Sequence, residues 1–438
     1  MPPRAPPTEL QELETTGLIR RLFDEPEPEF QFRHNLIQEA AYGMLTRVQR
    51  KQLHRRVGET LVSMYPDRLD EFADILARHF GAAGEIAAAI EYARRATRRA
   101  ASTYAYDEAC AHLEAALELL NEAGPHPERR TLLEELGDLY RSCRLGGKAI
   151  ASFQAALAEG QSDPTLNPQA ALCLHRKILQ TVADIKWAVE EAEFQAAEQT
   201  GIASRRALLE GLLSTRGAAL ELETARHLTV LSVDAWRTLL PHDWEAARVY
   251  AEEAFQIAEK FGDRVEMSSA LGALSQAHFG QGYLREHLEA AERRLAITED
   301  PTFEDLRERV DSLREVGLSR FALGDPRGAL PYLHRTVELA RQISAIDQQF
   351  NAWTLIAQCH LRLDEWDEVL AAEDRWREIA RGYTREQTGA TCFAVALSAM
   401  VRSLRGELEL AEAMRQESYD IMVKVSGSEV RWERNQHY

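Results

Sequence analysis

The residues of this chain that could bind phosphate, ligate a metal or act in catalysis include one Gly-Lys pair, thirteen histidines and five cysteines. A phosphate-binding loop needs G-x-x-x-x-G-K-[ST], so that backbone amides and a lysine hold the phosphates and a hydroxyl holds Mg²⁺. Gly147-Lys148 is followed by Ala149 and has no glycine five positions earlier, so it fails twice. The chain also lacks H-E-x-x-H and G-x-S-x-G, and its histidines show no metal-ligand spacing. We therefore expect no catalytic residue, no cofactor and no metal on this chain.

The cysteines are odd in number and include no C-x-x-C pair, which argues against a disulfide framework. Four of them, Cys110, Cys173, Cys359 and Cys392, lie in apolar, helix-patterned sequence, where a free thiol behaves as a small hydrophobic residue. We expect none of them to act as a nucleophile or a ligand.

Composition sets the class of protein. The 438 residues are 45% apolar and 28% charged, enough to bury a core, and the formal net charge of −18 repels a phosphate backbone. Glycine and proline are sparse, at 24 and 15 residues, which favours long helices over a β-sandwich. No apolar run reaches membrane-span length, and the first residues are not of signal-peptide type. We expect a cytoplasmic protein with no membrane contact.

The elements that must position any functional residue repeat along the chain. Apolar residues recur at i, i+3, i+4 and i+7 in paired segments, which predicts two helices per unit joined by a turn, such as LGDP at 323–326. A small residue in each first helix recurs at intervals of 40, 42, 40 and 42. These residues are Ala235, Ser275, Gly317, Ala357 and Ala399. A small side chain at a helix crossing lets the two backbones approach closely.

One copy, at residues 133–156, shows the tetratricopeptide signature W-x₂-L-G-x₂-Y…A-x₃-F almost completely. The matching residues are Leu133, Leu136, Gly137, Tyr140, Ala149 and Phe153. This resemblance covers roughly residues 69–160 and 227–425 in repeats longer than the usual 34 residues, and the Ser275/His287 copy is degenerate. Because one unit cannot cover its own apolar face, we expect an all-α, tetratricopeptide-like α-solenoid of antiparallel helix pairs.

The first sixty residues differ from the repeats. A short helix from Thr8, a break at Gly17, a strand at 18–23, an acidic turn and a returning strand at 29–33 are predicted. A helix followed by a β-hairpin is the second half of a winged helix. The predicted domains are a partial winged helix at 1–34, a helical connector at 35–66, N-terminal repeats at 67–160, an irregular helical pair at 161–226 and C-terminal repeats at 227–438.

The segment FRHNLIQEAAYGMLTRVQRKQLHRRVGETL resembles the end of the winged-helix module, and the start of the repeat array, in bacterial STAND-type regulatory ATPases. Many of these are fused to class III adenylate/guanylate cyclase domains and others to DNA-binding regulators. The matching residues are Phe32, Arg33, His34, Leu36, Ile37, Glu39, Ala41, Tyr42, Leu45, Arg50, Leu53 and His54. The resemblance implies a nucleotide-binding domain upstream of the winged helix, and we expect this chain to begin after it. His34 and His54 are then expected to pack helices.

The charges of this module argue against DNA binding. The helix that would enter the major groove carries Glu9, Glu12 and Glu14, and the wing carries Asp24, Glu25, Glu27 and Glu29. Two basic clusters remain, at 47–56 and at 94–99. We interpret both as solvated helix faces, with contact to an upstream ATPase domain or its nucleotide as the alternative for the first.

The repeat register places a set of mostly apolar residues on the concave face, which first helices line in this repeat type. The apolar members are Trp236, Leu239, Phe279, Leu318, Phe321, Leu361 and Met400, interleaved with Arg314, Gln358 and Arg362. Such a groove suits an amphipathic helix or an extended peptide. Some of these residues could instead belong to the core between helices.

The sequence therefore favours a non-catalytic protein-interaction and sensing arm of a signal-transduction regulator. The expected partners are a protein or peptide in the groove and, as the resemblance to the STAND proteins implies, an upstream nucleotide-binding domain. Two alternatives stay open. One is a transcription regulator whose winged helix contacts DNA, and the other is part of a nucleotide cyclase or ATPase whose catalytic domains lie upstream.

Overall fold

The structure is a computed structural model that describes residues 8–23, 29–103, 105–143, 145–161, 168–185, 191–214, 222–237, 242–381 and 389–426. Contacts divide the chain into two compact units, Met1–His126 (the N-terminal unit) and Pro127–Tyr438 (the C-terminal unit). The finer division into five domains stays a prediction.

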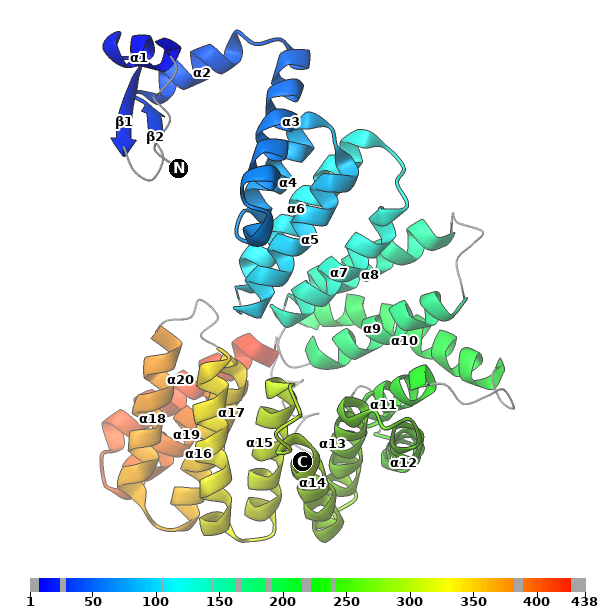
Figure 1. The fold of residues 1–438 in the computed structure, drawn as a ribbon. Helices are drawn as coiled ribbons and strands as arrows, with labels where there is room; N and C mark the ends of the chain where they lie inside the picture. Colours follow the sequence, from blue (N-terminus) through cyan, green and yellow to red (C-terminus); the bar gives the residue numbers. More distant parts are fainter. Residues whose placement is uncertain are drawn as a thin grey trace. The chain divides into compact units, whose positions relative to one another are not determined.

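The N-terminal unit opens with the predicted helix and hairpin. Helix α1 (Thr8–Thr15) ends before Gly17, whose φ of +75° suits a residue without a Cβ. Strands β1 (Ile19–Phe23) and β2 (Glu29–Phe32) pair antiparallel, with Ile19 opposite Phe32 (Figure 1). The predicted acidic turn at 24–28 lies outside the described residues. The helix and hairpin are confirmed, whereas their membership of a winged helix stays a prediction.

The helices that follow form the start of an array. Helix α2 (Asn35–Gly43) is separated from α3 (Arg47–Met64) because Thr46 and Gln49 form a capping box that begins a new helix. A 3-10 turn, η1 (Pro66–Arg68), leads to α4 (Ala73–Ala83), α5 (Ile86–Ser102) and α6 (Tyr106–Ala123). Each helix from α3 to α6 contacts the next, and Phe80 stacks on Tyr92 at 5.5 Å in the core of the α4/α5 pair.

The C-terminal unit continues as fourteen described helices (Figure 1). They are α7 (Glu128–Ser142), α8 (Gly146–Gln161), α9 (Pro168–Ile185), α10 (Glu191–Ser214), α11 (Leu222–Arg237), α12 (Trp244–Phe261), α13 (Arg264–Gly280), α14 (Leu284–Thr298), α15 (Leu306–Ala322), α16 (Pro326–Gln342), α17 (Ile346–Arg362), α18 (Trp366–Arg381), α19 (Gly389–Leu404) and α20 (Leu408–Ser426).

Two kinds of helix contact define the architecture of this unit. Nearly every helix packs against its neighbour in sequence, and α11, α13, α15, α17 and α19 also contact one another in order. The first helices of successive pairs thus form one continuous layer, with the second helices against it. This is the stacking that a repeat needs to bury its apolar face, and it confirms the predicted all-α, tetratricopeptide-like solenoid.

The small residues sit where the repeat register placed them. All five, from Ala235 to Ala399, are buried. A Cβ at Gly317 would lie 2.6 Å from Leu333 Cδ2, closer than two carbons can approach. In the degenerate copy, Ser275 and His287 fill these slots with a buried hydrogen bond of 2.7 Å between hydroxyl and Nδ1. Small residues are therefore required by packing between the two helices of a pair.

The irregular segment predicted at 161–226 contains the helix pair α9 and α10. Helix α9 packs against both α10 and α11, so the array continues through it into the C-terminal repeats. Across the described residues, no helix combines the length and apolar character that crossing a bilayer requires.

Candidate functional site

Three of the predicted groove residues lie along one face of α15. Arg314, Leu318 and Phe321 are each half-buried, whereas Leu313 and Val316 on the same helix are fully buried in the core. Because spacings of four and three residues follow the helix period, the three side chains form a partly exposed stripe on this first helix.

Phe321 and Arg362 are brought together from two successive first helices. The Arg362 guanidinium lies 4.1 Å from the centre of the Phe321 ring and donates a hydrogen bond of 3.2 Å to the Phe321 carbonyl. The Phe321 side chain also packs against the core cluster that contains Leu333 and Ile356. Arg362 is itself exposed, so the pair presents a cation held over an aromatic face.

The remaining groove candidates on α17 and α19 are at least partly exposed. Gln358 and Leu361 are half-buried, with Leu361 packed against the cluster around Ala357 and Val401, and Met400 is 44% exposed. The stripe on α15 is thus accompanied by accessible side chains on the next two first helices.

The two aromatic candidates nearer the start of the array are more enclosed. Trp236 is half-buried and stacks on Trp244, with ring centres 6.2 Å apart. Phe279 lies 5.0 Å from the ring of the buried His287. Leu239 lies outside the described residues. Both aromatics therefore contribute to packing between the helices of their own pair as well as to any outer surface.

Sequence reasoning missed a buried polar network between successive first helices. Arg294 on α14 donates to Glu308 (2.8 Å) and to Glu315 (2.6 Å) on α15, and its Nε donates to Ser268 on α13. A Cβ at position 272 would lie 2.7 Å from Arg294 Nη1, so Gly272 makes room for the guanidinium. Glu315 also accepts from Gln276 at 2.7 Å. The available signal was an arginine in the otherwise apolar face of a second helix.

A buried carboxyl, Glu266, links α13 to α11. It is 8% exposed, and burial raises its pKa to about 7. The Thr229 hydroxyl lies within hydrogen-bond distance of both the Glu266 carboxyl and the Ala225 carbonyl. Since this hydroxyl has a single proton, a protonated Glu266 that donates to Thr229 would satisfy both contacts.

We expect Glu266→Gln to stabilise the chain at pH 8 and to leave its stability at pH 5 nearly unchanged. A folded pKa near 7 against an ordinary 4.5 means that the native state binds more protons between these values. Stability contributed by this group is therefore full below pH 4.5 and falls as pH rises towards 7. Removing the charge should add about 1–3 kcal/mol at pH 8. Urea unfolding across this pH range measures it, with the exposed Glu259→Gln as control; a gain independent of pH would contradict the assignment.

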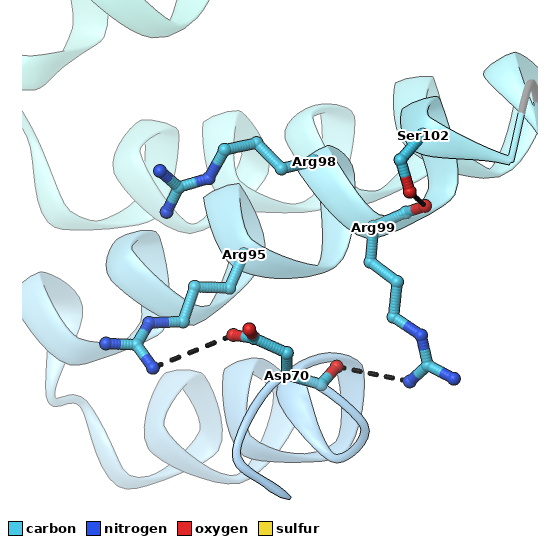
Figure 2. A pocket seen from close by; sticks show the side chains of 5 residues that line it. All are labelled: Asp70, Arg95, Arg98, Arg99 and Ser102. Carbon is cyan, nitrogen blue, oxygen red and sulfur yellow. Dashed lines mark hydrogen bonds and ion pairs between the residues drawn. The ribbon is translucent and has the colours of Figure 1, made fainter. Parts of the chain in front are cut away.

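In the N-terminal unit, arginines of α5 line an open pocket of 630 Å³ (Figure 2). Arg95 forms an ion pair with the Asp70 carboxylate at 3.7 Å, and Arg99 donates to the Asp70 carbonyl at 3.1 Å. Arg98 and Ser102 complete the lining. The basic cluster at 94–99 thus forms one wall of the pocket, and Asp70 neutralises part of its positive charge. The remaining positive charge would favour binding of a negatively charged group.

The segment that resembles the STAND proteins packs through its aromatic and imidazole rings. The Tyr42 hydroxyl lies 2.9 Å from His54 Nε2, and His54 Nδ1 lies 2.9 Å from His79 Nδ1 on α4. Arg50 stacks over Tyr42 at 4.6 Å. His54 therefore joins α3 to α4 as expected, whereas His34 is exposed at the start of α2.

The fold and the stripe together define a helical-repeat protein with accessible side chains on its first helices. No protein-family model matches the chain, and no curated protein matches it. Solved structures do match. One is a STAND protein with a tetratricopeptide repeat sensor from Pyrococcus horikoshii, at 13% identity and a TM-score of 0.48; the match covers 95% of this chain and 58% of that one.

Another match is the Rap conjugation gene regulator of the plasmid pLS20 in complex with the Phr* peptide, at 12% identity and a TM-score of 0.49, covering 82% of this chain and 95% of that one. A kinesin light chain from Podospora anserina with nearly identical repeats covers 47% of this chain, at 16% identity and a TM-score of 0.40. This chain spans 58% of the STAND structure. At these values the matches carry no inference about function.

Proposed function

We propose that the chain is the protein-interaction and sensing arm of a signal-transduction regulator and that it binds a peptide or helix across its first helices. The single observation that carries this proposal is the partly exposed stripe on α15 with Arg362 over Phe321. Aromatic and arginine side chains dominate binding at protein interfaces. Here two successive first helices present both types side by side, Phe321 from α15 and Arg362 from α17.

The polar network supports a role in sensing. A ligand that bridges two first helices binds one arrangement of the repeats more tightly than another. This difference in binding free energy shifts the chain towards the favoured arrangement. The links from Gln276 and Arg294 to Glu315 join successive repeats, and they have a fixed geometry that a change in repeat packing would break.

The same proposal includes a partner for the N-terminal unit. We infer that the partly exposed segment from α2 to α3, which resembles the STAND proteins, would contact a nucleotide-dependent module. A ligand-induced change in repeat arrangement would reach that module through this contact. The basic residues Arg47 and Arg56 are exposed on this segment and are available for such a contact.

We expect Phe321→Ala and Trp236→Ala to weaken capture of a peptide selected from a displayed library by about 30-fold each, the effect of losing an interface hot spot of about 2 kcal/mol. Titration calorimetry measures the affinity, and circular dichroism with thermal melting reports the fold. Arg362→Ala is the decisive companion, because its exposed guanidinium can be removed with little loss of stability. Phe261→Ala, an exposed aromatic on the second helix α12, is the control.

Two outcomes would count against this surface. In one, Arg362→Ala and Phe321→Ala bind the selected peptide as well as the unmodified chain does. In the other, Phe261→Ala weakens binding as much as they do, which would place the peptide on the second helices.

A further inference from the structure

Cys173, Glu223 and His227 lie together between α9 and α11 in the C-terminal unit. One ligand atom from each lies within 4.8 Å of the other two, and the Cys173 thiol donates to Glu223 Oε2 at 3.4 Å. Helices α9 and α11 pack against each other, so both backbones hold the three side chains in place. We propose that this cluster binds a divalent transition metal of the zinc type, with three ligands from the chain and a fourth position open.

The spacing of the donor atoms fits such an ion. Zinc binds thiolate sulfur at about 2.3 Å and carboxylate oxygen or imidazole nitrogen at about 2.0 Å. The corresponding edge of a tetrahedron between sulfur and oxygen is about 3.5 Å, against the observed 3.4 Å from Cys173 to Glu223. The imidazole nitrogen lies within 4.8 Å of both other donor atoms, against tetrahedral edges of about 3.3–3.5 Å, so it would have to move inward by up to about 1.5 Å.

His227 is the second, independent sign of a ligand. It is only 3% exposed, and its Nε2 has no hydrogen-bond partner among the residues that the structure describes. An unsatisfied polar atom in the interior costs free energy, so such an atom calls for an explanation. Burial, together with the nearby Arg176, lowers the pKa of His227 to about 4, which leaves the ring neutral and its lone pair available at neutral pH.

The two carboxylate oxygens of Glu223 have different neighbours. Arg226 donates to Oε1, whereas Oε2 faces Cys173 and lies 3.9 Å from Arg176 Nε. One oxygen is therefore held by an arginine, as ligating carboxylates commonly are, and the other is turned towards the thiol. The positive charge of Arg176 repels a cation that binds beside Glu223. Removal of that charge should therefore strengthen metal binding, which can be tested.

Binding would replace one proton by the metal. Burial and the neighbouring Glu223 raise the pKa of Cys173, so the thiol is protonated in the absence of metal. The sulfur forms its bond to the ion as the thiol proton leaves to solvent, and no oxidation is involved.

The experiment uses the full chain, reduced and freed of any affinity tag, titrated with Co²⁺ alone. We expect one ion per chain with a thiolate-to-cobalt absorption band, displaced by Zn²⁺, and a melting temperature raised by roughly 5 °C with saturating Zn²⁺. Cys173→Ser should remove the band and weaken binding by at least about tenfold. The control is Cys143→Ser, since Cys143 is also half-buried but lies outside the cluster.

A variant expected to bind the metal more tightly completes the test, because misfolding cannot explain a gain in affinity. Arg176→Gln removes the opposing charge, so it should tighten Co²⁺ binding by at least about tenfold. The proposal is overturned if the chain takes up no Co²⁺ at millimolar concentration, if the bound ion shows no thiolate band, or if Cys173→Ser binds as well as Cys143→Ser. A weakening of binding in Arg176→Gln would overturn it too.

Discussion

Replacing Arg294 with methionine is expected to destabilise the C-terminal unit by about 3–5 kcal/mol, because breaking a buried ion network leaves charges without a partner. Arg294 is 7% exposed and sits between Glu308 and Glu315, with hydrogen bonds of 2.8 and 2.6 Å. Burial alone would raise the pKa of Glu308, but the neighbouring guanidinium lowers it overall. Without Arg294, two carboxyl groups would remain enclosed against each other.

The pH dependence distinguishes this mechanism from a loss of packing. In the variant, burial without the arginine should raise the folded pKa of Glu308 above the unfolded value, so stability should fall as pH increases from 5 to 8. Urea unfolding at both pH values measures the change. Arg293→Met, a neighbouring exposed arginine stacked on Phe255, is the matched control and should cost about 1 kcal/mol or less.

A triple variant sharpens the test of the network. Arg294→Met combined with Glu308→Gln and Glu315→Gln removes the arginine together with the two carboxylates hydrogen-bonded to it, and most of the lost stability should return; the nearby Asp311 carboxyl stays in place. An equal loss in the single and triple variants, unchanged by pH, would show that the arginine acts only through its size.

Phe153→Ala is expected to cost about 3–5 kcal/mol, the usual penalty for deleting a fully buried aromatic ring. Phe153 is 0% exposed, and its ring fills the space above Gly137 in the α7/α8 pair. Urea unfolding followed by circular dichroism measures the loss. Phe261→Ala, in which the ring is 49% exposed, should cost about 1 kcal/mol or less.

A double-mutant cycle with Gly137 tests the contact itself. A Cβ at Gly137 would lie 2.5 Å from Phe153 Cε1, so Gly137→Ala should cost about 1–3 kcal/mol in the unmodified chain. In the Phe153→Ala background the obstructing ring is gone, and the same substitution should cost little or even stabilise the helix. Additive losses would mean that the ring moves aside and that the glycine is not required by packing.

The repeat architecture could be predicted from the sequence because its causes are local or periodic. Helical periodicity follows from side-chain spacing along one segment, and the need for Gly137 or Gly317 at a crossing follows from a distance set by the helix pair. The N-terminal helix and hairpin likewise depend on turn residues within a few positions, such as Gly17. Arg362 and Met400 are exposed, and their place in a binding groove stays a prediction.

The tertiary structure alone decided which polar residues meet. Arg294 lies 21 residues from Glu315, and Cys173 lies 50 residues from Glu223, so no local pattern joins them. From the sequence, Cys173 is expected to be inert because it lies in apolar, helix-patterned sequence with no C-x-x-C partner, and only the packing of α9 on α11 brings it to Glu223 and His227. Periodicity fixes which face of a helix is buried, but the rotation and offset between stacked repeats fix which side chains on those faces come within bonding distance.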